Sequence, residues 1–256
     1  MVNGAHIENS VSEFIFGREK ELDELRHRFS TRASFVLHGP SGAGKTFLLR
    51  RVIQTFPHVL YCPDSPAAQS VFQSLATQLL SAKSRRAKQF LHNPRAIKDK
   101  STIALRGIVL ESLRDGDYWV ALDHLRGPAA ALSGDVRDIM FYGNTRVLVV
   151  ARSVHMEDLG FLAPMFGLRA ERMPLSNFGR STARQFAEES AQLHGLMATN
   201  LPDFLDRIVN LSNGSPGAIV TMIKMAMQPR YRIRAHIKTS PLYIDCRLAW
   251  HAANAS

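Results

Sequence analysis

Residues 39–46 read GPSGAGKT and match the pattern GxxxxGK[ST] in full. The backbone N–H groups of such a loop can wrap the phosphates of a nucleotide, because glycine permits close approach and unusual φ angles. In this pattern the lysine reaches the β- and γ-phosphates, the hydroxyl that follows it binds Mg²⁺, and the N-terminus of the next helix adds partial positive charge. The sequence therefore predicts a phosphate loop that binds a nucleotide. We include Phe47, which follows the motif, so the predicted binding residues are Gly39, Pro40, Ser41, Gly42, Ala43, Gly44, Lys45, Thr46 and Phe47.

A phosphate loop needs a second metal anchor at the end of a neighbouring strand. Asp123 ends the apolar run at 118–123 (YWVALD) and is the candidate to hold Mg²⁺ with Thr46; the alternative is an ordinary aspartate at a strand end. The next position, where many phosphate-loop enzymes carry a second carboxylate that polarises the attacking water, is occupied by His124. A histidine could take that role near neutral pH. Alternatively, His124 is a structural or hydrogen-bonding residue and hydrolysis is slow.

The elements around the loop follow an α/β pattern. Residues 34–38 (SFVLH) form an apolar run that stops at the loop, and residues 45–55 resume helical periodicity. A strand, a glycine-rich loop and a helix form the start of a phosphate-binding α/β unit. Runs that are apolar at nearly every position are typical of strands buried on both faces. Further strands are expected at 58–62, 118–123, 146–151 and 169–175, and further helices at 18–29, 71–80 and 105–113.

The pattern changes to helices alone after Ser176, where 182–194, 200–211 and 216–227 have helical spacing. We therefore predict a nucleotide-binding α/β domain at 1–175, a helical lid at 176–228 and a basic C-terminal tail at 229–256, whose structure we do not predict. Within the first domain, the basic segment 83–100 contains Asn93-Pro94 and is expected to be a helix end followed by an exposed connection.

Four further stretches, in this order, resemble motifs of AAA+ ATPases of the STAND type. The phosphate loop and Asp123 would be the Walker A and Walker B motifs of that family. Residues 15–21 (IFGREKE) are similar to its hhGRExE signature, and residues 144–152 (NTRVLVVAR) to its fourth strand, which ends in a nucleotide-sensing arginine. Residues 174–176 (PLS) resemble the junction into the lid, and residues 214–216 (GSP) the GxP motif. The resemblance covers residues 14–228.

This resemblance implies a P-loop NTPase fold with five parallel strands in the order 5-1-4-3-2, and ATP bound between the sheet and a small C-terminal helical lid. Arg152 would sense the γ-phosphate, and Pro216 would flank the adenine together with Phe16, Gly17 and Arg18. Each motif also has an ordinary structural interpretation: residues 17–19 could simply start a helix, Arg152 could be a surface arginine, and residues 214–216 are a reasonable helix start. The chain ends soon after residue 228, so it resembles a short form without effector or repeat domains.

Composition excludes several classes of protein. Of the 256 residues, 45% are hydrophobic and 21% charged, as in globular proteins rather than disordered or fibrous ones. Cys62 and Cys246 form no CxxC motif, and no spacing of histidines suggests a zinc site. No stretch is apolar enough to be a secretory signal or to cross a membrane. We expect a cytoplasmic protein. The formal charge of +10 favours polyanionic partners, and the basic residues gather at 83–106 and in the tail.

The sequence favours an ATP-binding molecular switch that closes its lid on Mg·ATP and hydrolyses it slowly as a weak ATPase. The absence of an NKxD motif favours adenine over guanine. One alternative is an initiator-like, ATP-regulated protein that binds nucleic acid through its basic segments. The other is an interaction module that holds ATP or ADP without hydrolysing it. A protein partner is expected, and self-association is possible.

Overall fold

The computed structural model describes residues 16–31, 33–63, 67–125, 127 and 130–255. Their contacts form two compact units. One unit, here called the sheet unit, contains residues 22–39 and 48–175. The other, the helical unit, contains the described residues of 1–21, 40–47 and 176–256. The predicted division into 1–175, 176–228 and 229–256 stays a prediction, and Ile15 of the N-terminal signature lies outside the described residues.

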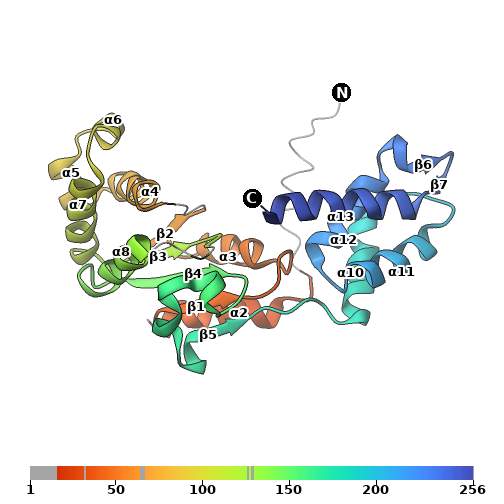
Figure 1. The fold of residues 1–256 in the computed structure, drawn as a ribbon, viewed down its shortest axis with the longest axis horizontal. Coiled ribbons are helices and arrows are strands. Elements are labelled where there is room, and N and C mark those ends of the chain that lie inside the picture. The colour runs from red at the N-terminus through yellow and green to blue at the C-terminus, as the bar shows by residue number, and fades with distance from the viewer. Residues whose placement is uncertain (1–15, 32, 64–66, 126, 128–129, 256) are drawn as a thin grey trace. The chain divides into compact units, whose positions relative to one another are not determined.

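The sheet unit is built on five parallel strands in the order β2-β3-β4-β1-β5 (Figure 1). This confirms the expected order 5-1-4-3-2, with the strand that precedes the phosphate loop inside the sheet. Because all five strands are parallel, their carboxyl ends lie along one edge. The strands are β1 (Phe35–His38), β2 (Val59–Cys62), β3 (Trp119–Leu122), β4 (Arg146–Ala151) and β5 (Arg172–Pro174).

Helices cover both faces of this sheet, and the alternation of side chains along each strand shows which residues face which layer. On one face, Phe35 and Trp119 form an aromatic cluster with Phe29 from α2, with ring centroids 4.8 Å apart for Phe29 and Trp119. On the other face, Val36 and Val120 belong to a core shared with α4, α7 and α8. The helices of this unit are α2 (Glu19–Thr31), α3 (Lys45–Ile53), α4 (Ala68–Ser81), α5 (Arg85–Phe90), α6 (Pro94–Lys98), α7 (Thr102–Arg114), α8 (Ala130–Phe141) and α9 (Met156–Leu159). Two 3₁₀ turns, η1 (Gly160–Phe166) and η2 (Arg169–Glu171), follow α9. The first turns of α2 and α3 are counted in the helical unit.

The basic segment 83–100 differs from its prediction as a helix end and connection, because it contains the two short helices α5 and α6. The side chain of Ser84 accepts a hydrogen bond from the Ala87 N–H and caps α5. The side chain of Asn93 accepts one from the Ala96 N–H and caps α6, with Pro94 at the first helical position. Asparagine followed by proline therefore starts a helix here, since proline has no N–H to leave unpaired in the first turn.

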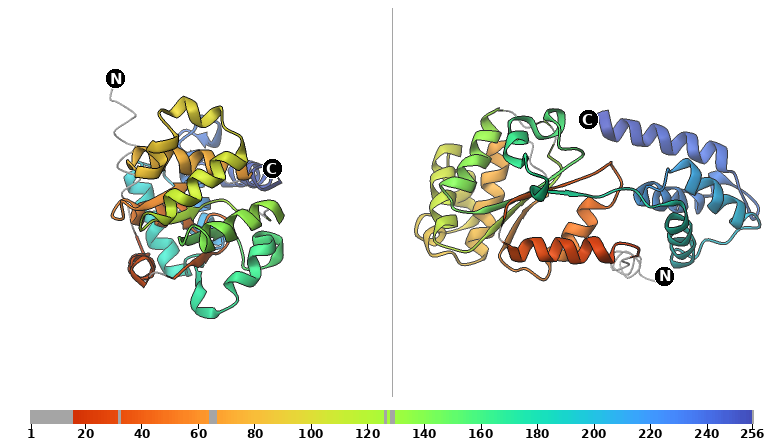
Figure 2. Two further views of the ribbon diagram at one scale, coloured as in Figure 1. Left: turned by 90° about the vertical axis from the view of Figure 1, so that its left-hand side faces the viewer. Right: turned by 90° about the horizontal axis from the view of Figure 1, so that it is seen from below.

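The helical unit packs α10 (Arg180–Leu193), α11 (Leu201–Leu211) and α12 (Pro216–Ala226) around their own apolar core. The tail is ordered as well. It forms the 3₁₀ turn η3 (Pro229–Tyr231), a hairpin of β6 (Arg232–Ile233) and β7 (His236–Ile237), and the helix α13 (Thr239–Ala255), whose course is visible in the right view of Figure 2. Among the described residues, no helix is long and apolar enough to cross a membrane.

Candidate functional site

The phosphate loop leaves β1 at a point where only glycine fits. The Gly39 N–H donates to the Arg152 carbonyl at 3.1 Å, and the Leu175 N–H donates to the His38 carbonyl at 2.7 Å. A Cβ atom on Gly39 would lie 2.0 Å from the Leu175 carbonyl oxygen, which is far inside van der Waals contact. Main chain from the ends of β4 and β5 therefore fixes where the loop begins.

The body of the loop makes a tight turn that belongs to the helical unit. The Ala43 N–H donates to the Pro40 carbonyl at 3.2 Å, and the Lys45 ammonium donates to the same carbonyl at 3.0 Å. Gly42 and Gly44 have φ angles of +79° and +97°, a region that favours glycine. Ser41 is exposed in the turn, whereas Thr46 and Phe47 are half-buried in the first turn of α3. The loop has the glycine conformations and the helix N-terminus that a phosphate cradle requires.

Arg18 of the N-terminal signature is buried, with 8% of its surface exposed, and it holds the loop in place. Its guanidinium donates to the Ala43 carbonyl at 3.1 Å, to the Ser176 carbonyl, and to Glu21 Oε1 at 2.6 Å. It also lies 4.3 Å from the centre of the Phe178 ring. One side chain thus joins the start of α2, the phosphate loop and the segment that leads into α10.

The other residues predicted to flank the adenine lie in the same unit. Phe16 packs against Phe186, with ring centroids 6.2 Å apart, and Gly17 has a φ of +64°. Pro216 is buried at the first position of α12. Beside it, the Gly217 N–H donates to the Gly42 carbonyl at 2.9 Å. The GxP segment therefore reaches the phosphate loop directly through its main chain.

Asp123 follows β3 in the sheet unit and its side chain is almost completely buried, at 1% exposed. The Tyr61 hydroxyl donates to Asp123 Oδ2 at 2.8 Å, and the His124 N–H donates to Oδ1 at 2.8 Å. Arg50 Nε in turn donates to the Tyr61 hydroxyl at 3.3 Å. Burial is the main cause that raises the pKa of Tyr61 to about 12, and the hydrogen bond to Asp123 acts in the same direction. The tyrosine therefore stays neutral and donates to the carboxylate.

His124 has a φ of +55°, which is uncommon for a residue with a side chain. Its side chain is 54% exposed, and its Nε2 atom lies 3.9 Å from Asp123 Oδ2. The backbone turn directs the imidazole to the surface beside the buried carboxylate. The structure thus places the two residues side by side, as their adjacency in the sequence requires.

The carboxyl-end edge of the sheet carries three of the predicted residues. Gly39 follows β1, Asp123 follows β3 and Arg152 follows β4, and these strands are neighbours in the sheet. Arg152 is half-buried, and its carbonyl is the one that accepts from Gly39. Sequence reasoning missed Tyr61 and Arg50, which contact the Asp123 carboxylate directly or through one hydroxyl. The only available signal was a tyrosine near the end of a strand that pairs with β3.

The residues present suit a nucleotide with a hard divalent cation. A hydroxyl and a carboxylate are oxygen ligands that Mg²⁺ uses together with substrate phosphates. Each oxygen of Asp123 accepts one hydrogen bond and retains a lone pair for a further interaction. Within the described residues, no group of three or more His, Cys, Asp and Glu side chains could hold a metal ion by itself.

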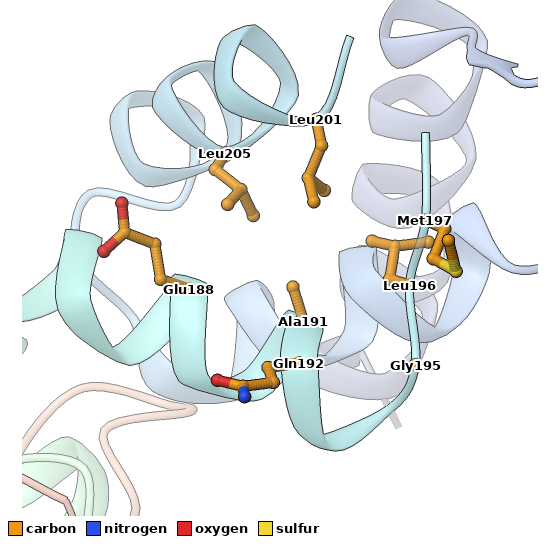
Figure 3. Close-up of a pocket in the computed structure, with 8 residues that line it drawn as sticks. All are labelled: Glu188, Ala191, Gln192, Gly195, Leu196, Met197, Leu201 and Leu205. Atoms are coloured by element: carbon orange, nitrogen blue, oxygen red, sulfur yellow. The ribbon is translucent and has the colours of Figure 1, made fainter. Parts of the chain in front are cut away.

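A pocket of about 360 Å³ lies elsewhere in the helical unit, between α10 and α11 (Figure 3). None of the predicted site residues lines it, so we do not assign the nucleotide to it. Its lining is apolar except for two residues at α10 and consists of Glu188, Ala191, Gln192, Gly195, Leu196, Met197, Leu201 and Leu205.

Comparisons with known proteins identify the family and support the fold. The sequence pattern described as the AAA ATPase domain matches residues 15–220. A Walker-type ATPase of Pyrococcus abyssi has a similar structure, with a TM-score of 0.62 and 19% identity over 84% of this chain and 69% of its own. The ORC1 protein of Aeropyrum pernix in complex with DNA has a TM-score of 0.62 and 14% identity over 93% of this chain and 66% of its own.

A third similar structure is a signal transduction ATPase with numerous domains (STAND) and a tetratricopeptide repeat sensor, from Pyrococcus horikoshii. Its TM-score is 0.50, with 15% identity over 83% of this chain. This chain spans 30% of the length of that protein. A search of curated proteins found no significant match.

Proposed function

Because the chain belongs to the AAA ATPase domain family, we propose that it is an ATP-binding switch that hydrolyses ATP slowly. One observation carries this proposal: the complete phosphate loop is held by two elements that are far from it in the sequence. Arg18 donates to the carbonyl of Ala43, and Gly217 donates to that of Gly42. A change in the loop on nucleotide binding must therefore be felt by α2 and α12, which is what a switch requires.

The proposed binding residues are those that the sequence motifs predict. The Lys45 ammonium and the N-terminus of α3 bind the phosphates, whereas Thr46 and Asp123 supply oxygen ligands for Mg²⁺. When bound, Mg²⁺ neutralises part of the phosphate charge. Arg152 is proposed to sense the γ-phosphate. The adenine is proposed to lie against Pro216 and against the signature residues Phe16, Gly17 and Arg18.

Hydrolysis is proposed to be slow because no second carboxylate follows Asp123. In its place, the neutral imidazole of His124 accepts a proton from the attacking water. Asp123 Oδ2 lies 3.9 Å from the Nε2 atom of this imidazole. The Tyr61 hydroxyl keeps the Asp123 carboxylate in one orientation. In this scheme the chain positions the nucleotide and takes up one proton from the attacking water.

The test is phosphate release from Mg·ATP, with nucleotide binding measured on the same samples. Lys45→Ala should abolish binding and turnover, whereas Lys20→Ala, which removes an exposed lysine from α2, should change neither. His124→Ala should keep binding and lose turnover. Failure of the wild-type chain to bind Mg·ATP near millimolar concentration would refute the proposal. If His124→Ala still hydrolysed ATP, the proposed role of the imidazole would be refuted, but the proposal that the chain binds ATP would stand.

We propose nucleic-acid binding as a second candidate function, which the charges around α5 and α6 support. In the described part of the chain, none of six cations there is engaged in an ion pair. Asp99 is the only acidic residue of segment 83–100. A surface of this kind suits the phosphates of DNA or RNA, and the similar ORC1 structure is a complex with DNA. The six cations are Lys83, Arg85, Lys88, Arg95, Lys98 and Lys100.

Titration of a fluorescent DNA duplex at several salt concentrations tests this candidate. Arg86 already pairs with Asp115 at 3.2 Å, so Arg85→Ala with Lys88→Ala is the sharper double variant. If both side chains contact phosphates, the slope of log K against log salt should fall by roughly 2 in magnitude. The matched control removes two exposed cations from the helical unit, with Arg207→Ala and Lys224→Ala. Equal binding by the two double variants would refute a site at α5.

We further propose that the protein is cytoplasmic and acts on a partner protein, with self-association as one form of that partnership. Two observations support the compartment. Both cysteines are free and buried, which suits a reducing environment. Burial raises the pKa of the Cys62 thiol to about 11 and keeps it in its unreactive form.

A further inference from the structure

The C-terminal helix α13 places an aromatic ring on the phosphate loop. A Cβ atom added to Gly42 would lie 2.6 Å from Cη2 and 2.9 Å from Cζ2 of Trp250. The same atom would lie 2.6 Å from the Ser215 hydroxyl oxygen. The indole ring and the N-terminus of α12 therefore cover Gly42 so closely that they leave no room for one methyl group.

This contact is built into the packing of α13. Leu242, Cys246 and Trp250 recur every fourth residue, so they lie on one face of the helix. Leu242 is fully buried and Cys246 is 5% exposed in the core of the helical unit, where α13 lies along α12 (Figure 1). The Tyr231 hydroxyl donates to Asp245 Oδ2 at 2.7 Å and ties the helix to η3. The face that anchors α13 thus continues to the phosphate loop.

The loop under this ring is held by contacts within the protein. The Gly42 carbonyl accepts from the Gly217 N–H, and the Lys45 ammonium donates to the Pro40 carbonyl. To bind phosphates, the ammonium must turn from that carbonyl toward the nucleotide. Because the indole fits so tightly on Gly42, a loop that rearranges there must lose the ring contact. An apolar ring also gives a triphosphate less stabilisation than water or backbone N–H groups.

We propose that Trp250 is an intramolecular cover on the phosphate loop, and that the phosphates of a nucleotide displace it when they bind. The inference rests on the proposed nucleotide site and adds a means of regulating it. A partner that takes hold of α13 would uncover the loop and raise the affinity for nucleotide. In the same way, bound nucleotide would release the end of α13 for such a partner.

The test measures the affinity for Mg·ADP by calorimetry in the wild-type chain, Trp250→Ala, Trp250→Phe and Leu248→Ala. Leu248 is the matched control, because it lies on the same helix and is 64% exposed. If the covered form makes up about four fifths of the protein, removal of the ring should tighten binding about five-fold. Leu248→Ala should bind as the wild type does, and Trp250→Phe should fall between.

Tryptophan emission gives a second readout, because the chain contains only Trp119 and Trp250. Trp119 is 5% exposed in the sheet unit and serves as a constant background. Saturating Mg·ADP should shift the emission of the wild-type chain to the red, as Trp250 enters water, and leave Trp250→Phe unchanged. Amide hydrogen exchange at residues 40–47 without nucleotide should be faster in Trp250→Ala than in Leu248→Ala.

Each other outcome overturns the inference in a different way. Unchanged affinity in Trp250→Ala, or unchanged emission while Mg·ADP binds, would show that the ring is no cover. Weaker binding in Trp250→Ala would make the ring a nucleotide contact instead. Lys45→Ala is expected not to bind nucleotide. If the wild-type chain also failed to bind Mg·ADP and Mg·ATP, the proposed function itself would fail and this inference with it.

Discussion

Replacement of Arg18 by alanine should destabilise the helical unit more than the loss of any exposed arginine. The guanidinium is buried, and two of its acceptors are main-chain carbonyls, at Ala43 and Ser176. Its remaining contacts are the Glu21 carboxylate and the face of the Phe178 ring. Alanine would leave the two carbonyls without this donor and would open a space between three segments of chain.

The magnitude follows from these contacts. A hydrogen bond to a charged group contributes roughly 1.5–3 kcal/mol, and a cation–π contact adds roughly 0.5–2 kcal/mol. The ion pair with Glu21, whose side chain is 28% exposed, adds about 0–1 kcal/mol because water screens it. Such contributions are not additive within one network, and water can reach part of the space that alanine leaves. We therefore expect Arg18→Ala to lower the free energy of unfolding by about 3 kcal/mol.

Urea denaturation followed by tryptophan emission measures this change. In a Trp119→Phe background the remaining tryptophan is Trp250, which belongs to the helical unit. Arg26→Ala is the control, because Arg26 pairs with Asp23 at the surface, where such pairs contribute about 0–1 kcal/mol. Arg18→Lys should recover only part of the loss, because one ammonium cannot reproduce the fork of the guanidinium. A loss in Arg18→Ala no larger than that in Arg26→Ala would refute the structural role assigned to Arg18.

Three further predictions concern the sheet unit. Gly39→Ala should lower the free energy of unfolding by more than about 2 kcal/mol, because its Cβ would lie 2.0 Å from the Leu175 carbonyl oxygen; an unchanged denaturation midpoint would contradict this. Since the pKa of Tyr61 is raised to about 12, its hydrogen bond to Asp123 is fully present below the ordinary pKa near 10 and is lost as pH rises through 12. Thermal melts should therefore show the stability advantage of the wild type over Tyr61→Phe shrinking between pH 10 and 12, and an advantage that grows over this range would reverse the argument. Cys62, whose pKa is raised to about 11 by burial, should resist iodoacetamide at pH 8 in the folded protein and react in urea, as mass spectrometry would show; rapid labelling of the folded chain would contradict its burial.

Strands β1 to β4 could be predicted because each lies in an apolar run, whereas the segment of β5 reads Arg-Met-Pro and carries no such signal. The helix α8 has buried Leu132, Val136 and Ile139 at helical spacing, but Gly134 interrupts the pattern, so no helix could be predicted there. The tail could not be placed from the sequence, because α13 carries apolar side chains on more than one face, such as the buried Leu242 and the exposed Leu248, and is ordered by contacts with α12 and η3. Local propensity gives little information where tertiary packing decides the structure.

The candidate site divides in the same way. The phosphate loop and Asp123 could be proposed from type and spacing alone, because their chemistry requires those residues at those positions. Tyr61 could not be found, since its contact with Asp123 depends on β2 lying next to β3. The part that Arg18 plays in fixing the phosphate loop depends on main-chain carbonyls, which no sequence motif records.

Residues 40–47 of the phosphate loop belong to the helical unit, although Gly39 belongs to the sheet unit. Regions that open together usually follow such contact boundaries, so the loop should melt as part of the helical unit. A ligand bound to the loop adds its free energy of binding to the unit that must be folded to hold it. In a calorimetric scan, Mg·ADP should therefore raise the melting temperature of the helical unit more than that of the sheet unit. The concentration of nucleotide in the cell would then determine the rate at which proteases cleave α10–α13. This effect would not require hydrolysis of ATP.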